Sequence, residues 1–523
     1  MSSPIFPKAV TADIAREALT NALADPRFRA APSVSAAVFD TSGIVSWSGW
    51  GLAKMSGAKP TRKTIYRIAS MSKSFLAAAA LQLQERHLLS LQDSLSHALP
   101  EFRDKFHLDT CADDHSLADQ ITLEMLLSNR SGLPEDNPWV DDNLDIPVSD
   151  FLALVSDKGL RLTFPPNMLY QYSNIGMSLV GRALERVTGQ PIEQYIKENI
   201  FIPLGLTNTS YTVPVSKTSH IAHGYLSFDS QLTWEEVPFI EGGALGCIGS
   251  IFSTPDDIAR WSQFLSSAFH EQDSVMNKRW ATVLSAQSRR EMQRIHTPIH
   301  SSDDRLLSRD LDNTGYGMGL IVEQDHRLGR IVQHSGGLPG FSSNMRWHAR
   351  SQIGTVVFAN TAEYPAAETA AYILSEVCGS IGVPAEAIQL WPETEAAVAA
   401  FDHAIRARKG LGSTPVPVAR NLFRNRPLEV RQQELQKLVD ELGGIDPFQP
   451  ELSQRWISAD SSACARWAIW CRSGTLVGEV NLLSIAPHPV QALRICKANS
   501  HDALQNRLPH LMDHAHVITT QVV

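Results

Sequence analysis

A serine and a lysine three residues apart, Ser70 and Lys73, are well placed in this chain to do chemistry together. They precede an apolar segment, residues 75–83, whose composition predicts a buried helix. Residues i and i+3 share one face of a helix, so we expect the lysine amine beside the serine oxygen. A partly desolvated lysine can take the proton of a serine hydroxyl and turn it into a nucleophile. The same segment also permits a second interpretation, in which Ser70 only caps the helix.

A second Ser-x-x-Lys match, at Ser56 and Lys59, shows how little the spacing means by itself. This copy is followed by Pro60 and lies in a polar stretch, residues 54–63, which predicts a surface turn. No helix begins there to align the two side chains, so we expect Ser56 to be without a catalytic role.

Tyr172 and Asn174 form a second candidate group, at the end of a predicted loop and just before a helix expected over residues 175–187. A tyrosine phenol near a lysine can carry a proton. The Asn174 amide can hold a substrate carbonyl or orient the lysine. By themselves, the two residues also match a half-buried core tyrosine and a helix-capping asparagine.

A third group, His334-Ser335-Gly336-Gly337, follows a strand expected over residues 329–334. His334 can share a proton or bind an anionic group. Glycines let the backbone approach a ligand closely, and the N–H of Gly337 can complete an oxyanion hole with the N–H of Ser70. The alternative is a glycine-rich turn with an incidental histidine.

Metal chemistry is a further alternative, because three groups of histidines have spacings that a metal ion can use. They are His220 with His223, His296 with His300, and His510 with His514 and His516. Pro298 interrupts any helix that would align the second pair, and no cysteine or acidic residue completes a recognisable motif. We therefore expect no metal site and no organic cofactor.

Composition narrows the class of protein. The chain has 523 residues, of which 43% are hydrophobic and 19% charged, values that are ordinary for a globular enzyme. A formal net charge of −9 and the lack of a basic stretch argue against nucleic-acid binding. No run is apolar enough to span a bilayer, and the N-terminus lacks a signal-peptide core, so we expect no membrane association and a cytoplasmic location.

The strands and helices that are expected to position the candidate residues predict an α/β (α+β) fold. Strands expected near residues 34–50 and again over 319–360 indicate one sheet built from both ends of a domain, with a helical lobe inserted at about 75–315. We place this domain at residues 1–384. A linker is predicted at 410–417, within a smaller β-rich domain over 385–523.

The three groups together resemble the serine β-lactamase and penicillin-binding-protein superfamily, over about residues 30–378. Ser70-x-x-Lys73, Tyr172-x-Asn174 and His334-x-Gly336 occur in the order of that superfamily's motifs. The branch that holds class C β-lactamases, D-aminopeptidases, D-alanyl-D-alanine carboxypeptidases, family VIII esterases and lovastatin-type acyltransferases is the most similar. The resemblance implies a β-lactamase/transpeptidase-like antiparallel sheet flanked by helices.

The resemblance also implies roles for the residues. Ser70 would attack a carbonyl and form an acyl-enzyme, while Lys73 and Tyr172 would handle its proton in an order that the sequence leaves open. The N–H groups of Ser70 and Gly337 would hold the oxyanion. Asn174 and His334 would bind and orient a small-molecule ester, amide or thioester.

Departures from the superfamily pattern indicate an unusual cleft. His334 replaces the usual lysine of β-lactamases, which shifts the expectation from β-lactam breakdown toward ester, amide or acyl-transfer chemistry. Asn129-Arg130 stands where His-Thr is frequent, and Pro166-Asn167 where Pro-Gly is usual.

Three functions therefore compete. The leading hypothesis is a serine hydrolase acting on an ester or amide. The second is an acyltransferase or thioesterase, which products formed with and without an added alcohol or amine would distinguish. The third is a non-catalytic scaffold of the same fold, against which the presence of Ser70, Lys73 and Tyr172 argues. Each of these three functions is compatible with a protein that forms a homo-oligomer.

Overall fold

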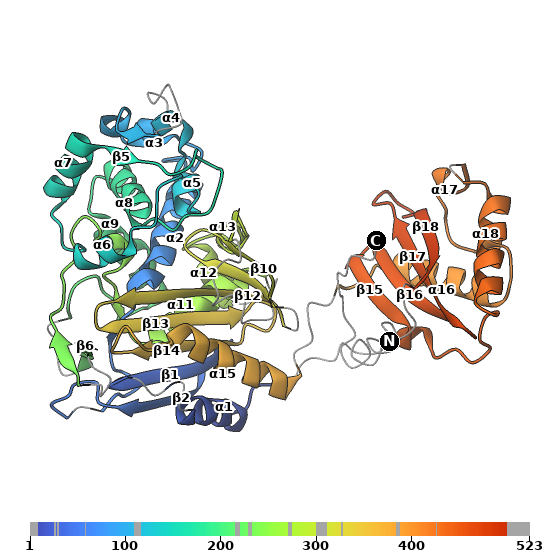
Figure 1. Ribbon diagram of the computed structural model, residues 1–523, viewed down its shortest axis with the longest axis horizontal. Helices are drawn as coiled ribbons and strands as arrows, with labels where there is room; N and C mark the ends of the chain where they lie inside the picture. Colours follow the sequence, from blue (N-terminus) through green and yellow to red (C-terminus); the bar gives the residue numbers. More distant parts are fainter. Residues whose placement is uncertain are drawn as a thin grey trace. The chain divides into compact units, whose positions relative to one another are not determined.

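The structure is a computed structural model. It describes residues 9–25, 28, 31–57, 59–108, 117–214, 220–228, 233–269, 275–299, 311–325, 328–382, 388–424 and 426–498. The chain divides into two compact units, Met1–Val383 and Pro384–Val523 (Figure 1). Each unit has an apolar core of its own.

An eight-stranded antiparallel sheet forms the centre of the first unit (Figure 1). In spatial order its strands are β2 (Gly43–Gly51), β1 (Ser33–Asp40), β14 (Gly354–Ala359), β13 (Phe341–His348), β12 (Gly329–Leu338), β11 (Ile321–Asp325), β10 (Leu311–Tyr316) and β9 (Thr297–Pro298). Two strands come from the beginning of the unit and six from its end. The predicted fold class, a sheet joined from both ends with helices between, is confirmed.

Helices cover both faces of this sheet because its central strands are apolar on both sides. On one face, α1 (Ala12–Ala24) and α15 (Ala366–Ile381) pack in a cluster with Val357 of β14. The neighbouring Val356 and Phe358 belong to the cluster of the opposite face, as the two-residue period of a strand requires. There α11 (Pro255–Ser266) covers the sheet, and α2 (Ser72–Glu85) packs in the same apolar cluster.

The helical lobe lies between β2 and β9 in the sequence. Besides α2 and α11 its helices are α3 (Leu95–Ala98), α4 (Leu117–Gln120), α5 (Leu123–Leu127), α6 (Asn137–Asp142), α7 (Val148–Lys158), α8 (Asn174–Thr188), α9 (Ile192–Ile196), α10 (Ile202–Leu204), α12 (Val275–Ala281) and α13 (Ala286–Met292). Short strand pairs join β3 (Tyr66–Arg67) to β8 (Phe252–Ser253), β4 (Phe106–His107) to β5 (Leu160–Arg161), and β6 (Gly224–Leu226) to β7 (Glu235–Val237). Helix α2 is buried from Ser72 to Leu83, so its N-terminal turn is held firmly.

In its described residues, the second unit contains a four-stranded antiparallel sheet and three α-helices. The strands are β15 (Trp456–Ser461), β16 (Cys464–Cys471), β17 (Gly474–Leu482) and β18 (Val490–Lys497), and the helices are α16 (Pro392–Arg406), α17 (Asn421–Arg424) and α18 (Leu428–Glu441). The predicted linker at 410–417 is wrong, because Leu411 is buried in the core of this unit. Glycine, serine and proline are equally typical of tight turns, and composition alone does not report burial.

One helix prediction and one strand prediction need correction in detail. The helix after Tyr172 begins at Asn174 and is capped by Ser173, not by Asn174. Strand β12 continues to Leu338, so His334 and the glycines after it lie within a strand and not in a turn. Among the described helices, none combines the length and the apolar character needed to cross a bilayer.

Candidate active site

Ser70 lies in a single 3-10 turn, η2 (Ala69–Met71), directly before α2. The side chain of Ser70 caps neither helix, since no side-chain capping hydrogen bond is present at Ile68 or Met71, the two N-cap positions. Instead Lys73 Nζ donates a hydrogen bond of 2.9 Å to Ser70 Oγ. The geometry therefore favours the nucleophile interpretation over the helix-cap interpretation.

The turn that carries Ser70 is strained and closely packed. Ala69 has φ +48°, a left-handed conformation that a residue with a Cβ rarely adopts. Strand β12 runs so close that a Cβ at Gly336 would lie 2.2 Å from the carbonyl oxygen of Ile68. Ser343 Oγ donates a 2.8 Å hydrogen bond to that same oxygen. Because Gly336 has no side chain, the turn that carries Ser70 can pack directly against strand β12.

Lys73 is fully buried, and burial lowers its pKa to about 7. The negative charges of Asp141 and Asp136, both from the segment around α6, act in the opposite direction. Lys73 Nζ also donates to the carbonyl oxygen of Ile248 at 3.3 Å. An amine in this environment is divided between its charged and neutral forms at neutral pH.

Tyr172 lies directly against this pair. Lys73 Nζ is 4.9 Å from the centre of the Tyr172 ring. Burial raises the pKa of Tyr172 well above its ordinary value, while a hydrogen bond with Ser70 acts in the opposite direction. The structure therefore brings Ser70, Lys73 and Tyr172 together, with a phenol that stays protonated.

The backbone around Tyr172 is held by Asn129. The Asn129 carbonyl oxygen accepts from Gln171 N at 2.9 Å, and its Oδ1 accepts from Ser173 N at 3.0 Å. Asn129 has φ +56° and Asn167 has φ +67°. Asparagine tolerates this left-handed region better than most residues, which explains how it replaces the superfamily's usual glycine at 167.

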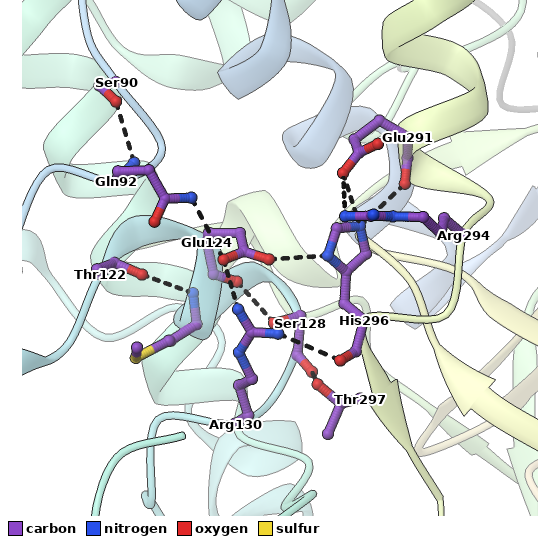
Figure 2. A network of polar contacts seen from close by, with 11 residues as sticks. Ser90, Gln92, Thr122, Glu124, Ser128, Arg130, Glu291, Arg294, His296 and Thr297 are labelled. Carbon is purple, nitrogen blue, oxygen red and sulfur yellow. Dashed lines mark hydrogen bonds and ion pairs between the residues drawn. The ribbon is translucent and has the colours of Figure 1, made fainter. Parts of the chain in front are cut away.

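A polar network braces the loop that contains Asn129 (Figure 2). Glu124 Oε1 pairs with His296 Nδ1 at 2.8 Å, and the other oxygen of Glu124 pairs with Arg130. Arg130 in turn donates to the carbonyl oxygen of His296 at 3.2 Å, and Thr297 Oγ1 donates to that of Ser128 at 2.8 Å. The network ties the 128–130 loop to the segment that enters β9.

Asn174 begins α8 and is 1% exposed. Its Nδ2 donates to Asp136 Oδ1 at 3.0 Å and to Asn137 Oδ1 at 2.6 Å. Asp136 also accepts from the backbone N–H groups of Asn174 and Ile175, at 2.8 Å and 2.9 Å, and from Ser173 Oγ at 3.0 Å. A carboxylate distant in sequence therefore holds the start of this helix.

His334 is buried, and both of its ring nitrogens are engaged. Nδ1 donates to the carbonyl oxygen of Ser335 at 2.6 Å, and Tyr316 Oη donates to Nε2 at 3.0 Å. Burial lowers the pKa of His334 to about 3, and the nearby Lys73 charge acts in the same direction. The neutral ring therefore orients Tyr316, whose own ring contacts Tyr172.

Gly337 differs from Gly336 because it is exposed and a Cβ there would meet nothing within 4 Å. Ser56, from the second Ser-x-x-Lys match, lies in an exposed turn and not on a helix. Among the described residues, no group of three His, Cys, Asp or Glu side chains is arranged to hold a metal ion. Of the histidines whose spacing a metal ion could use, His300, His510, His514 and His516 lie outside the described residues.

Several residues of the site were missed from the sequence. They are Asp136, Asn137, Asp141, Tyr316 and Glu124, together with His296, which the sequence suggested only as a metal ligand. Apart from the pair of Glu124 with Arg130, their contacts in the site join residues that are far apart in sequence, so no local spacing reveals them. The one signal in the sequence was Asn129-Arg130, which stands where the superfamily often has His-Thr. These two residues lie in the loop that the Glu124 network holds.

Comparison with known proteins assigns the chain to a family. A family model described as Beta-lactamase matches residues 20–377 of the chain. The chain is 26% identical over 318 residues to penicillin-binding protein 4* of Bacillus subtilis, covering 58% of this chain and 62% of that protein. It is 27% identical over 335 residues to the unguisins hydrolase ungD' of Aspergillus campestris, covering 63% and 58%. The matches thus span about three fifths of the length of these relatives.

Solved structures show the same fold. The octameric penicillin-binding protein homologue from Pyrococcus abyssi matches with a TM-score of 0.58 and 18% identity, over 92% of this chain and 99% of that chain. A D-amino acid amidase from Ochrobactrum anthropi SV3 matches with a TM-score of 0.54 and 21% identity, over 70% and 99%. At these identities the likeness is one of fold alone.

Proposed function

The chain belongs to the Beta-lactamase family, and we propose that it is a serine hydrolase that cleaves an ester or amide of a small molecule through an acyl-enzyme on Ser70. The observation that carries this proposal is the 2.9 Å hydrogen bond between Lys73 Nζ and Ser70 Oγ. Because burial lowers the pKa of Lys73 to about 7, much of this amine is neutral at neutral pH and can accept a proton.

The proposed acylation assigns an order to the protons. Ser70 Oγ attacks the substrate carbonyl carbon, and its proton passes to the neutral Lys73 amine. The bond to the leaving group breaks as Tyr172 gives that group a proton, and Lys73 then restores the proton of Tyr172. The raised pKa of Tyr172 supports a role as proton donor and not as phenolate base. Water then attacks the acyl carbon, the bond from that carbon to Ser70 Oγ breaks, one proton of the water returns to Ser70 Oγ, and the acyl group leaves as the acid.

Backbone geometry supports the proposed oxyanion hole. Leu338 and Phe341 close a two-residue turn, so Gly337 and Ser342 form the next pair of the ladder. In an antiparallel hairpin this next pair is not hydrogen-bonded across the strands. The N–H of Gly337 therefore points away from β13, and with the N–H of Ser70 it would stabilise the negative oxygen of the tetrahedral intermediate.

Labelling with a fluorophosphonate probe tests the proposal. We expect Ser70 in the wild-type protein to be labelled, as shown by mass analysis of its peptide. Ser70→Ala should remove the label, and Lys73→Ala should slow labelling by roughly 10²–10⁴-fold, since the two residues act as one unit.

Ser56→Ala is the matched control, because it removes the serine of the other Ser-x-x-Lys match. Its labelling should equal that of the wild type. Absence of label on the wild-type protein, or label that survives Ser70→Ala, would refute the proposed mechanism.

A further inference from the structure

His334 has no polar ring atom left for a substrate. The carbonyl oxygen of Ser335 can only accept a hydrogen bond, so His334 Nδ1, which lies 2.6 Å from it, must carry a hydrogen. The other nitrogen of a neutral imidazole is an acceptor, and the Tyr316 hydroxyl donates to it at 3.0 Å. Since His334 is also only 3% exposed, both ring nitrogens are committed to the protein.

The same hydrogen bond fixes Tyr316 at a second point. Tyr316 is the last residue of β10 and His334 lies in β12, so the bond spans the intervening strand β11. The backbone of Tyr316 is held by its pairing with Ile321 of β11, and its side chain is completely buried. A phenol that is held at its backbone and at its hydroxyl has little freedom to turn its ring.

The fixed ring of Tyr316 contacts Tyr172, whose position is central to the proposed chemistry. Tyr172 belongs to no helix or strand, so the direction of its side chain depends on its neighbours. The two rings meet edge to face, with centroids 6.1 Å apart and planes at 75°. The Tyr172 side chain is hydrogen-bonded with Ser70, and Lys73 Nζ lies 4.9 Å from the centre of the Tyr172 ring. A shift of Tyr316 would therefore move the Tyr172 hydroxyl relative to the reacting atoms.

We propose that Tyr316 is a positioning residue, whose hydrogen bond to His334 fixes the Tyr172 ring so that the Tyr172 hydroxyl meets Ser70. In this arrangement His334 anchors Tyr316 and binds no anionic group of the substrate, whereas the sequence resemblance implied that His334 binds and orients the substrate. The inference rests on the proposed function, in which Tyr172 gives the leaving group its proton. Loss of the Tyr316 hydroxyl should therefore slow the reaction most where the leaving group needs that proton.

A matched pair of phosphonate esters tests this expectation without the natural substrate. In diphenyl hexylphosphonate and bis(para-nitrophenyl) hexylphosphonate, Ser70 Oγ forms a bond to phosphorus and one aryloxy group leaves. Nitrophenol is the stronger acid, so its anion leaves readily without a proton, whereas the phenoxy group depends more on a proton donor. The measurement is the second-order rate constant for inactivation by each compound, expressed as the ratio of the nitrophenyl rate to the phenyl rate.

Tyr316→Phe keeps the ring and removes the hydroxyl. We expect this variant to slow the phenyl ester by about tenfold or more and the nitrophenyl ester much less, so that the ratio rises. Tyr364→Phe is the matched control, because it removes the hydroxyl of another buried tyrosine, which accepts from Thr369 Oγ1 and lies in the cluster with α1 and α15. The control should keep the wild-type ratio. A wild-type ratio in Tyr316→Phe would overturn the inference.

Variants of His334 answer the same question if Tyr316→Phe does not fold. His334→Gln supplies a carbonyl oxygen that can accept from the Tyr316 hydroxyl, and His334→Leu supplies no acceptor. The ratio should rise in His334→Leu and stay closer to the wild-type value in His334→Gln. An unchanged ratio in His334→Leu would contradict the anchoring role. Circular dichroism checks the folding of each variant.

A third compound tests the competing role of His334 as a binder of anions. Bis(meta-carboxyphenyl) hexylphosphonate adds a carboxylate to each leaving group of the phenyl ester. If His334 is only an anchor, the wild-type protein should react with this compound no faster than with the phenyl ester. A rate at least about tenfold larger, with the gain lost in His334→Gln, would show that His334 binds an anion and would overturn the inference.

Labelling with the fluorophosphonate separates this inference from the proposed function. If the probe labels Ser70 while Tyr316→Phe keeps the wild-type ratio, the hydrolase proposal stands and the inference fails. If the probe does not label Ser70, the hydrolase proposal fails and the inference fails with it.

Discussion

In the proposed mechanism, the charge state of Lys73 determines the pH range in which Ser70 reacts. Burial lowers the pKa of this lysine to about 7, while Asp141, Asp136 and Cys247 act in the opposite direction. The amine must be neutral to take the Ser70 proton, so the rate of acylation should rise with pH through about 7 and level off above it.

Removing one of the negative charges near Lys73 should shift the pH at which the rate of acylation rises. In Asp141→Asn the loss of a negative charge lowers the pKa of Lys73 further, so the midpoint should move to lower pH by about half a unit. The measurement is the rate of Ser70 phosphonylation between pH 5 and 9. Asp142→Asn, on the same helix and exposed, is the control and should keep the wild-type midpoint. A midpoint that moves upward in Asp141→Asn would contradict the assignment of Lys73 as base.

At the scale of elements, the candidate site depends on a loop that contains none of the residues with a proposed catalytic role. Asn129 holds the backbone on both sides of Tyr172, and the Glu124, Arg130 and His296 network holds the loop (Figure 2). The hydrogen bond from His296 and the charge of Arg130 lower the pKa of Glu124 below its ordinary value of 4.5. The folded state therefore favours the ionised carboxylate.

Glu124→Gln should destabilise the protein by about 2 kcal/mol at pH 7, because it leaves Arg130 without its ionic partner. A carboxyl whose folded pKa is depressed stabilises above its unfolded pKa, and this contribution is lost as the pH falls through the folded pKa. The urea midpoints of variant and wild type should differ from pH 7 down to about pH 5 and converge below pH 4. Glu101→Gln, which breaks the exposed pair with Arg186, should change the midpoint little. A constant difference across this pH range would show that the charge of Glu124 is not the cause.

At the scale of the whole molecule, the residues of the site all lie in the first unit, whereas the second unit has its own core and a buried ion pair. Asp402 accepts from Arg455 through both oxygens at 2.7 Å, and the side chains of both residues are nearly inaccessible to solvent. The two units are therefore expected to unfold separately.

Asp402→Asn should destabilise the second unit by about 3–5 kcal/mol, because it leaves the Arg455 charge buried and uncompensated. Calorimetry should show one lowered transition and one unchanged transition, with wild-type labelling of Ser70. Glu434→Gln, which affects an exposed pair with Arg426, is the control and should leave both transitions in place. Loss of labelling together with the second unit would show that the units depend on each other.

The sequence determined the elements and the family. Apolar composition placed the helix after Ser70, and short runs bounded by turn residues placed most of the sheet strands. The same reasoning located Ser70 and Lys73, because their relation is one helical turn and needs no tertiary contact. It failed at 410–417 and at the end of β12, where glycine-rich composition is shared by linkers, turns and closely packed strands.

Only the tertiary structure decided how those residues are used. It showed that Ser70 is no helix cap, that the nitrogens of His334 are occupied, and that the Asn174 amide is turned by Asp136. Each of these depends on a hydrogen bond between side chains or on a depth of burial set by distant segments. A pKa and an amide orientation follow from the charges and donors that surround a group in space, and their positions are fixed only when the chain has folded.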